Sequence, residues 1–146
     1  MKKLKFTLIA LFAVSALVLS ACSIPVNAGS LTGTTWSLVS YGAAAGQTPA
    51  AADVATSLVF GTDGQVSGNM GCNSFGGKYA VKDGEITFSE VVSTMMACTN
   101  ESVMTQEQSA LKILNGSVKY ELNGSTLVIF DSTGENALTL SSVSGK

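Results

Sequence analysis

The segment Val118-Lys-Tyr-Glu-Leu-Asn-Gly-Ser-Thr-Leu-Val-Ile-Phe130 decides the fold. Two runs rich in β-branched and aromatic residues, 118–122 and 126–130, flank Asn123-Gly124. Asn-Gly between alternating runs is the strongest short-range signal for a β-hairpin, because both residues tolerate the positive φ that tight hairpin turns require. The segment therefore predicts two antiparallel strands joined by a tight turn.

The same alternation of strand-like runs and turn signals recurs through most of the chain. Thr62-Asp-Gly64, Lys82-Asp-Gly84 and Asp131 to Gly134 supply further turns. The other expected strands are 36–41, 57–60, 65–70, 78–81, 85–88 and 137–140. We therefore predict a mainly β (α+β) fold, a compact antiparallel β meander that forms a small, partly open barrel-like sheet with one packed helix.

Residues 102–114 provide that helix, because their apolar residues recur at helical spacing. The apolar face would consist of Val103, Met104, Ala110, Leu111 and Leu114. The polar residues expected to face water are Gln106, Glu107, Gln108 and Lys112. Asn100 or Ser102 is suited to cap its start, and Asn115-Gly116 is suited to end it. We expect this helix to pack over or plug the sheet.

The Ala-rich stretch 43–56 shows neither the alternation of a strand nor the helical spacing of apolar residues. A connection of this length is either functional or loosely ordered. Its low complexity favours loose order.

The first 21 residues have the layout of a bacterial lipoprotein signal peptide. A Lys-rich start precedes the apolar run 6–18, and Leu19-Ser-Ala-Cys22 resembles the lipobox motif. The run is shorter than the roughly 20 apolar residues that a membrane-spanning helix needs. We expect cleavage before Cys22 and lipidation of its thiol. An ordinary secreted protein cut near Ala21 is the alternative.

This signal predicts a domain organisation and a location. Residues 22–30 would form a lipidated tether, 31–141 the folded domain and 142–146 a C-terminal tail. The lipid anchor would hold the protein at a membrane of the cell envelope. Ser23, rather than Asp, follows the Cys, which favours the outer membrane in a cell with two membranes.

The charge and composition of the expected mature chain exclude several functions. Residues 22–146 contain five Lys and ten Asp or Glu, a net charge of −5, and the chain has no Arg and no His. Nucleic-acid binding depends on Lys and Arg that neutralise phosphates, so we expect no nucleic-acid partner. His is the commonest general base in catalysis and the commonest metal ligand. We therefore expect a protein that is not an enzyme, with no catalytic residue, metal or cofactor.

The remaining cysteines fit an exported domain, in which disulfides persist. If Cys22 carries lipid, only Cys72 and Cys98 are left to pair. Closing a loop of 27 residues would stabilise the domain by about 3.5 kcal/mol in the chain-entropy model. Redox catalysis or metal binding is the alternative, but the two cysteines do not form C-x-x-C and no His accompanies them.

Several motifs in this order of strands resemble one known family. The resemblance lies in Leu31-Thr-Gly-Thr-Thr-Trp36, in Gly71-Cys-Asn-Ser-Phe-Gly-Gly-Lys-Tyr79 and in Thr94-Met-Met-Ala-Cys98. These motifs are similar to those of the META domain family, which includes the HslJ-like heat-shock lipoproteins, and the likeness covers roughly 31–140. It implies an antiparallel β domain with a helix and the same pairing of cysteines. It also implies export or lipid anchoring, links to heat or antibiotic tolerance, and no established catalytic residues.

The aromatic and methionine side chains are the remaining candidates for a site. Most aromatic residues are expected in the core, but in a partly open barrel some could line an apolar groove for a lipid tail or a peptide. The candidate groove residues are Trp36, Phe60, Phe75, Tyr79 and Phe88. Met70, Met95 and Met96 could suggest a copper(I) site, although gap-filling near the disulfide is the favoured interpretation.

These features lead to one expected function and two alternatives. We expect a monomeric envelope lipoprotein that supports stress tolerance by binding an envelope protein or a small apolar ligand. The first alternative is a carrier or sensor of apolar ligands. The second is a thiol-redox protein that uses Cys72 and Cys98.

Overall fold

The computed structural model describes residues 30–143. The expected signal peptide 1–21 and the lipidation residue Cys22 lie outside the described residues. So do nearly all of the tether 22–30 and most of the tail 142–146.

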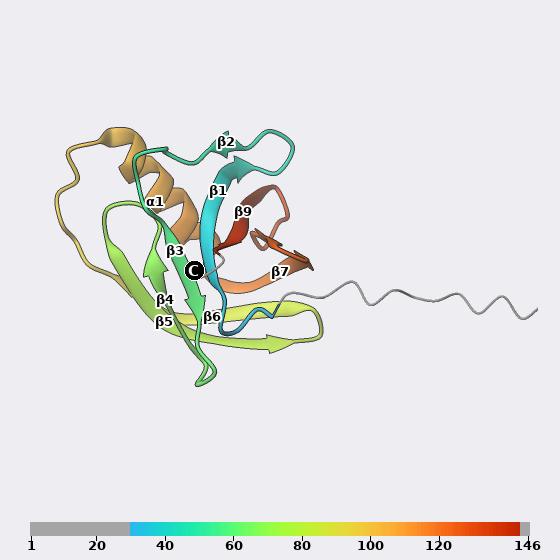
Figure 1. Ribbon diagram of the computed structural model, residues 1–146. Helices are drawn as coiled ribbons and strands as arrows, with labels where there is room; N and C mark the ends of the chain where they lie inside the picture. Colours follow the sequence, from blue (N-terminus) through green and yellow to red (C-terminus); the bar gives the residue numbers. More distant parts are fainter. Residues whose placement is uncertain (1–29, 144–146) are drawn as a thin grey trace, which may run out of the picture.

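Within the described residues, nine strands form a single antiparallel sheet (Figure 1). They are β1 Thr35–Ala43, β2 Thr48–Pro49, β3 Ser57–Phe60, β4 Gln65–Asn69, β5 Ser74–Lys82, β6 Glu85–Ser93, β7 Gly116–Asn123, β8 Thr126–Phe130 and β9 Asn136–Val143. From β3 to β9 each strand pairs with its neighbour in the sequence. The β7–β8 hairpin predicted from Asn123-Gly124 is present, with Asn123 opposite Thr126 and Gly124 at φ 60°.

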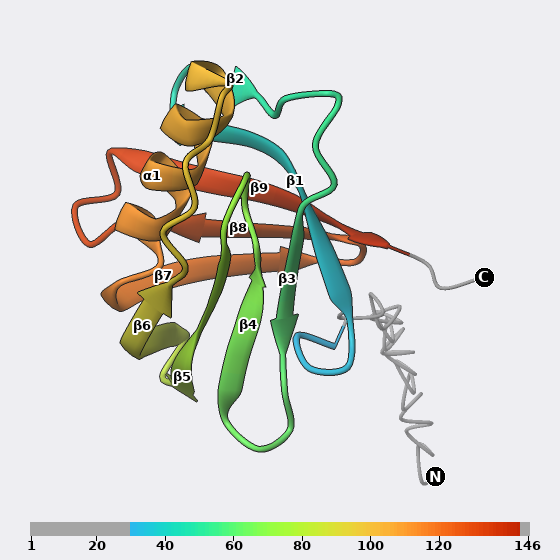
Figure 2. The same cartoon turned by 90° about the vertical axis from the view of Figure 1, so that its left-hand side faces the viewer.

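Pairing of β1 with β9 closes the sheet into a barrel (Figure 2). The ladder runs from Thr35 opposite Val143 to Ala43 opposite Asn136. Eight strands form the barrel, and the short β2 is added at the edge of β1. The predicted mainly β fold with one helix is confirmed, and the barrel that the sequence suggested to be partly open is closed by this pairing.

Inward-facing side chains from the barrel strands fill the interior. In β1, Trp36 and Leu38 are buried. A β-bulge between Leu38 and Ser40 shifts the alternation by one residue, so the next buried side chain is Tyr41 rather than Ser40. Bulges of this kind add one residue to a strand and turn its later side chains to the other face. The bulge therefore keeps Tyr41 in the core.

Helix α1 spans Glu101–Ile113 and lies at one end of the barrel, against β1 and β9 (Figures 1 and 2). Asn100 caps it, because its Oδ1 accepts hydrogen bonds from the N–H groups of Ser102 and Val103. The predicted helix and its cap are confirmed. At 13 residues, α1 is too short to cross a membrane, and the part of the chain that the structure describes contains no other helix.

The buried face of α1 differs from the predicted one. Gln106 and Glu107, expected to face water, are buried, and Met104, expected on the apolar face, is 38% exposed. The face that packs inward runs through Val103, the two polar residues, Ala110 and Ile113. The prediction holds for Val103, Ala110 and Leu114, which are buried. It is wrong for Gln106 and Glu107, because their part of the face meets backbone N–H and carbonyl groups of loops, which polar side chains satisfy.

The Ala-rich stretch 43–56 is fastened to the barrel rather than loosely ordered. Gln47 Oε1 accepts hydrogen bonds from the hydroxyls of Ser40 and Thr139, and Gln47 Nε2 donates to the Ala137 carbonyl at 2.9 Å. The N–H of Ala51 donates to Gln106 Oε1 at 2.7 Å. A few side chains, which composition does not reveal, therefore order this connection.

Candidate functional site

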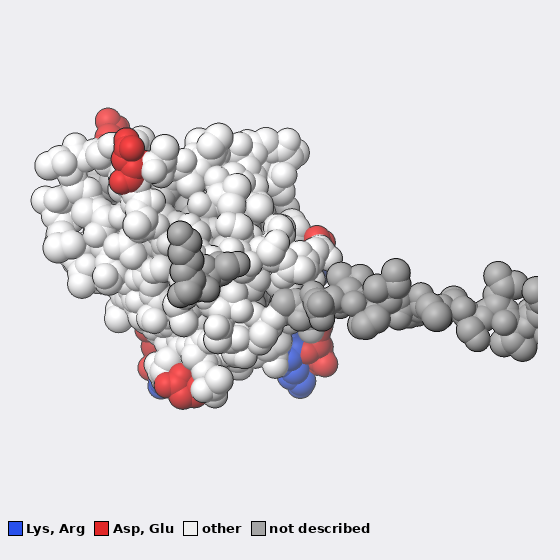
Figure 3. Space-filling view, in the orientation of Figure 1, with Lys and Arg blue, Asp and Glu red and all other residues white. Residues whose placement is uncertain are grey.

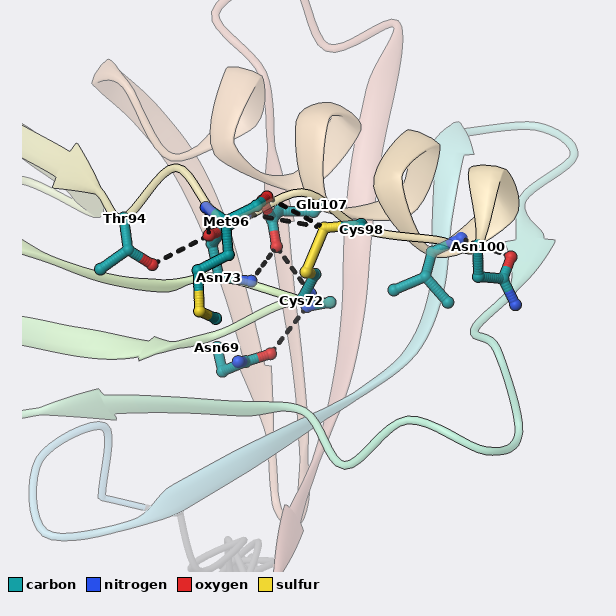
Figure 4. Close-up of a disulfide and its surroundings, with 10 residues drawn as sticks. Asn69, Cys72, Asn73, Thr94, Met96, Cys98, Asn100 and Glu107 are labelled. Atoms are coloured by element: carbon teal, nitrogen blue, oxygen red, sulfur yellow. Dashed lines mark hydrogen bonds between the residues drawn. A yellow bond between two sulfur atoms is a disulfide. The ribbon is translucent and has the colours of Figure 1, made fainter.

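A disulfide joins two segments at the end of the barrel where α1 lies (Figure 4). Cys72 lies in the β4–β5 connection and Cys98 lies in the segment 94–99 that leads into α1. Their Cα atoms are 6.0 Å apart. The structure contains the pairing that the sequence predicted, and both residues are half-buried. The bridge ties the segment before the helix to the barrel.

Glu107 lies beside this bridge and holds the β4–β5 connection against α1. Its Oε2 accepts hydrogen bonds from the N–H of Cys72 at 2.7 Å and from the N–H of Asn73. Its Oε1 accepts one from Asn73 Nδ2 at 2.8 Å. The side chain is only 6% exposed. A buried carboxylate is costly unless hydrogen bonds satisfy it, and here three N–H donors do so.

Asn73 connects Glu107 to the segment 94–99 through its side-chain hydrogen bonds. Its Oδ1 accepts hydrogen bonds from Thr94 Oγ1 at 2.9 Å and from the N–H of Met96 at 2.7 Å. Figure 4 shows Asn73 between Glu107 on one side and Thr94 and Met96 on the other. The segment is thus held at Thr94 and Met96 by the side-chain amide of Asn73, and at Cys98 by the disulfide.

Gln106 and Gly71 complete the contact between α1 and the β4–β5 connection. Gln106 Nε2 donates to the Met70 carbonyl at 2.7 Å. A Cβ at Gly71 would lie 2.8 Å from the Val103 carbonyl oxygen and 2.9 Å from Glu107 Cβ. Real Cβ atoms essentially never approach this closely, so only glycine allows the helix to come so near.

The restrained segment presents large apolar side chains to water. Met95 is 96% exposed and Met96 is 60% exposed, and Val92 near the end of β6 is 71% exposed. We call these three residues the methionine surface. Fully burying a Val or Met side chain would stabilise a protein by about 1.5–3 kcal/mol. The fold instead holds three such side chains, within five residues of sequence, in the solvent.

The three methionines considered as a copper(I) site are not brought together. Met70 is fully buried in the core, whereas Met95 and Met96 are exposed. Gap-filling therefore describes Met70 and does not describe the other two. Within residues 30–143, no group of three or more His, Cys, Asp and Glu residues is arranged to hold a metal ion.

The five aromatic residues proposed to line a groove belong to the packed interior. Trp36, Phe60, Phe75 and Phe88 are at most 5% exposed, and Tyr79 packs against the same core. The rings of Phe60 and Tyr79 meet edge to face with centroids 4.9 Å apart. The structure thus places these side chains in the core of the closed barrel, which is the position favoured for most aromatic residues, and not along an open groove.

Two clefts on the described part of the molecule share the β8–β9 turn. One, of about 530 Å³, is bordered by the β5–β6 turn, by β7 and by residues 130–134. The other, of about 460 Å³, lies between the C-terminal end of α1 and the same turn. Neither contains a residue that the sequence marked as a site. Figure 3 shows that charged side chains on the face seen there gather near its edges.

Asp131 organises the β8–β9 turn at the junction of these clefts. Its carboxylate accepts hydrogen bonds from the side chains of Asn136 and Thr133 and from the backbone N–H groups of Thr133 and Glu135. Burial alone would raise the pKa of Asp131, but the hydrogen bonds outweigh it and lower the pKa to about 2. The ionised form is therefore the one that this turn stabilises.

Asp131 makes the stability of the domain depend on pH at the acid end. Because its pKa in the folded state is about 2 and its ordinary value is 3.8, its contribution is complete above pH 3.8 and is lost as the pH falls towards 2. We expect Asp131→Asn to be less stable than the wild type by about 1 kcal/mol at pH 7, after allowance for solvent screening. The difference should shrink at pH 2.5. Urea unfolding at both values checks this, and a difference that grows on acidification would contradict it.

Sequence reasoning missed Asn73, Gln106 and Glu107 as a connected group. One signal was available, since the two helical residues lie three and four positions after Val103 and four and three before Ala110. That spacing places them on the apolar face. Asn73 directly follows Cys72, but the sequence does not show that its side chain reaches two segments at once.

Comparisons with known proteins give a family and a fold. The model of the META domain family matches residues 29–144. An NMR structure of a protein from Burkholderia xenovorans is similar, with 23% identity and a TM-score of 0.64 over 79% of this chain and 85% of that chain. A second NMR structure has 21% identity and a TM-score of 0.59 over 74% of this chain and 87% of that one. Comparison with curated proteins finds no match.

Proposed function

This chain belongs to the META domain family, and from that premise we propose that it is a non-enzymatic lipoprotein of the bacterial envelope. Cys22 would carry the lipid anchor. The domain would contribute to heat or antibiotic tolerance by binding an envelope protein through the methionine surface.

The observation that supports a protein partner is the way in which the methionine surface is held. Thr94, Met96 and Cys98 are fixed by hydrogen bonds or by the disulfide, while the side chains of Met95 and Met96 reach into water. Methionine is flexible and polarisable, and it is common at surfaces that adapt to protein partners. A backbone that is already ordered reduces the entropy lost on binding.

The position of the surface relative to the tethered end agrees with this proposal. The chain enters the described domain at Ser30, just before β1, whereas the segment before α1 lies on the far side of the molecule (Figure 1). A domain tethered by its N-terminal end would therefore turn the methionine surface away from the membrane.

The two alternative functions have less support. A carrier of apolar ligands needs an open interior, but the aromatic residues of the barrel pack against one another. A redox role for Cys72 and Cys98 competes with their structural role, because the bridge stands beside the hydrogen bonds that Glu107 and Asn73 make. We therefore propose that the disulfide supports the surface and does no redox chemistry.

Complementation of a deletion strain tests the role of the surface. Met95→Ser/Met96→Ser should lose protection against heat or envelope-targeting antibiotics, because both apolar contacts are removed. Its melting temperature should stay close to that of the wild type, since exposed substitutions usually change stability by no more than about 0.5 kcal/mol. Val39→Ser/Val81→Ser is the matched control, because these residues are 48% and 45% exposed on other strands. Full protection by the methionine variant, at an equal protein level, would show that the methionine surface does not bind the partner.

The anchor is tested with Cys22→Ser in the same strain. Without the thiol no lipid is attached, so the protein should move from the membrane fraction to the soluble fraction. Retention in the membrane fraction would show that the thioether lipid is not what holds it there.

A further inference from the structure

We propose that Met95 and Met96 form an oxidant-reactive site, which hypohalous acids convert to methionine sulfoxides while the domain stays folded. Oxidation of these two side chains on the methionine surface follows from their exposure, and its effect on partner binding rests on the proposed function.

Exposure separates the methionines of the domain into distinct classes. Met95 is 96% exposed and Met96 is 60% exposed, Met104 is 38% exposed, and Met70 is fully buried. Oxidation of a thioether requires that the oxidant reach the sulfur, so access decides the order of reaction. The structure predicts the order Met95, then Met96, then Met104, and Met70 last.

The reaction balances with one oxidant for each methionine. The thioether sulfur donates an electron pair to the chlorine of hypochlorous acid, so an S–Cl bond forms and the O–Cl bond breaks. Water then attacks the sulfur and displaces chloride. In total, one thioether and one HOCl give one sulfoxide, one proton and one chloride. The sulfur loses two electrons and the chlorine gains them.

The fold tolerates this change because the segment is not held by the methionine side chains. The restraints act on the Thr94 hydroxyl, on the Met96 N–H and on Cys98. In Figure 4 the side chain of Met96 points away from α1. A sulfoxide oxygen at either exposed sulfur therefore enters water. At Met70 the same oxygen would enter the apolar core, where a polar group without a partner is destabilising.

Oxidation would change the chemistry of the methionine surface without changing its backbone. A sulfoxide is polar, whereas the thioether is apolar. If the proposed function is correct, the oxidised surface binds its partner more weakly. Hypohalous acids outside the cell would then control the interaction.

The test treats the purified full-length chain, disulfide intact, with increasing hypochlorous acid and measures the sulfoxide at each methionine by peptide mass spectrometry. We expect Met95 and Met96 to react at least about tenfold faster than Met70 in the folded protein. In denaturant the rates should become equal, which shows that structure and not local sequence sets the order. Equal rates in the folded protein would overturn the inference.

A stability measurement and a variant complete the test. At the dose that fully oxidises Met95 and Met96, the melting temperature should remain that of the untreated protein, and a large fall would overturn the inference. Met95→Leu/Met96→Leu should consume two fewer equivalents of oxidant. In cells, this variant should keep its protection after hypochlorous acid treatment while the wild type loses it. Failure of only that last result would reject the regulatory consequence and leave the oxidation site standing.

Discussion

Glu107→Ala is expected to lower the free energy of unfolding by about 3–5 kcal/mol. The substitution removes the acceptor of three hydrogen bonds, from the N–H groups of Cys72 and Asn73 and from Asn73 Nδ2. Each buried donor left without an acceptor costs about 1–3 kcal/mol. Because whole domains are stable by only about 5–15 kcal/mol, the loss should be plain in urea or guanidinium unfolding.

Two further variants of α1 make this result specific. Gln108→Ala changes an exposed side chain next to Glu107 and should shift stability by no more than about 0.5 kcal/mol. Glu107→Gln retains one oxygen for the two backbone donors but turns an NH₂ group towards Asn73 Nδ2, so an intermediate loss is expected. If Glu107→Ala unfolds at the same denaturant concentration as Gln108→Ala, the Glu107 carboxylate does not hold the β4–β5 connection against α1.

Replacing both cysteines, as Cys72→Ala/Cys98→Ala, is expected to destabilise the domain by about 3.5 kcal/mol. The bridge closes a segment with a sequence separation of 26, and its loss restores conformational freedom to the unfolded chain. Equilibrium unfolding of the variant beside the oxidised wild type measures the difference. The barrel strands contain neither cysteine, so the far-ultraviolet circular dichroism should keep its β character.

The two effects should not add. Without the bridge, the connection around Cys72 is free to move, and its N–H groups gain access to water when Glu107 is removed. Glu107→Ala should therefore cost about 1 kcal/mol less in the variant without cysteines, as expected for residues that share a contact. Strict additivity would contradict the direct link between the carboxylate and the bridge. The wild type treated with a reductant is the control for effects of the alanine side chains.

The strands and hairpins of this protein could be predicted because their signals are local. The turn between β7 and β8 is set locally by Gly124, whose φ of 60° is one that glycine adopts without steric cost wherever the rest of the chain lies. The cap by Asn100 is equally local, because its acceptor and its donors lie within three residues. The cysteine pairing followed from counting once Cys22 was assigned to the lipid.

The candidate site could be predicted only in part. The sequence indicated the bridge and favoured the core for the aromatic residues, but it placed Gln106 and Glu107 in water. The sequence does not show whether a polar side chain faces solvent or a loop N–H group. The hydrogen-bond partners of Glu107 lie more than thirty residues away in the sequence. Met95 and Met96 resembled gap-filling side chains for the same reason.

The sequence by itself determined the strand order, the hairpin turns, helix α1 and the bridge, because each depends on neighbouring residues or on a count. Tertiary structure decided the closure of β1 on β9, the burial of Glu107 and Gln106, and the exposure of the methionine surface. These depend on which distant backbone groups require a hydrogen-bond partner once the chain has packed. Such a requirement arises only when water has been excluded from them.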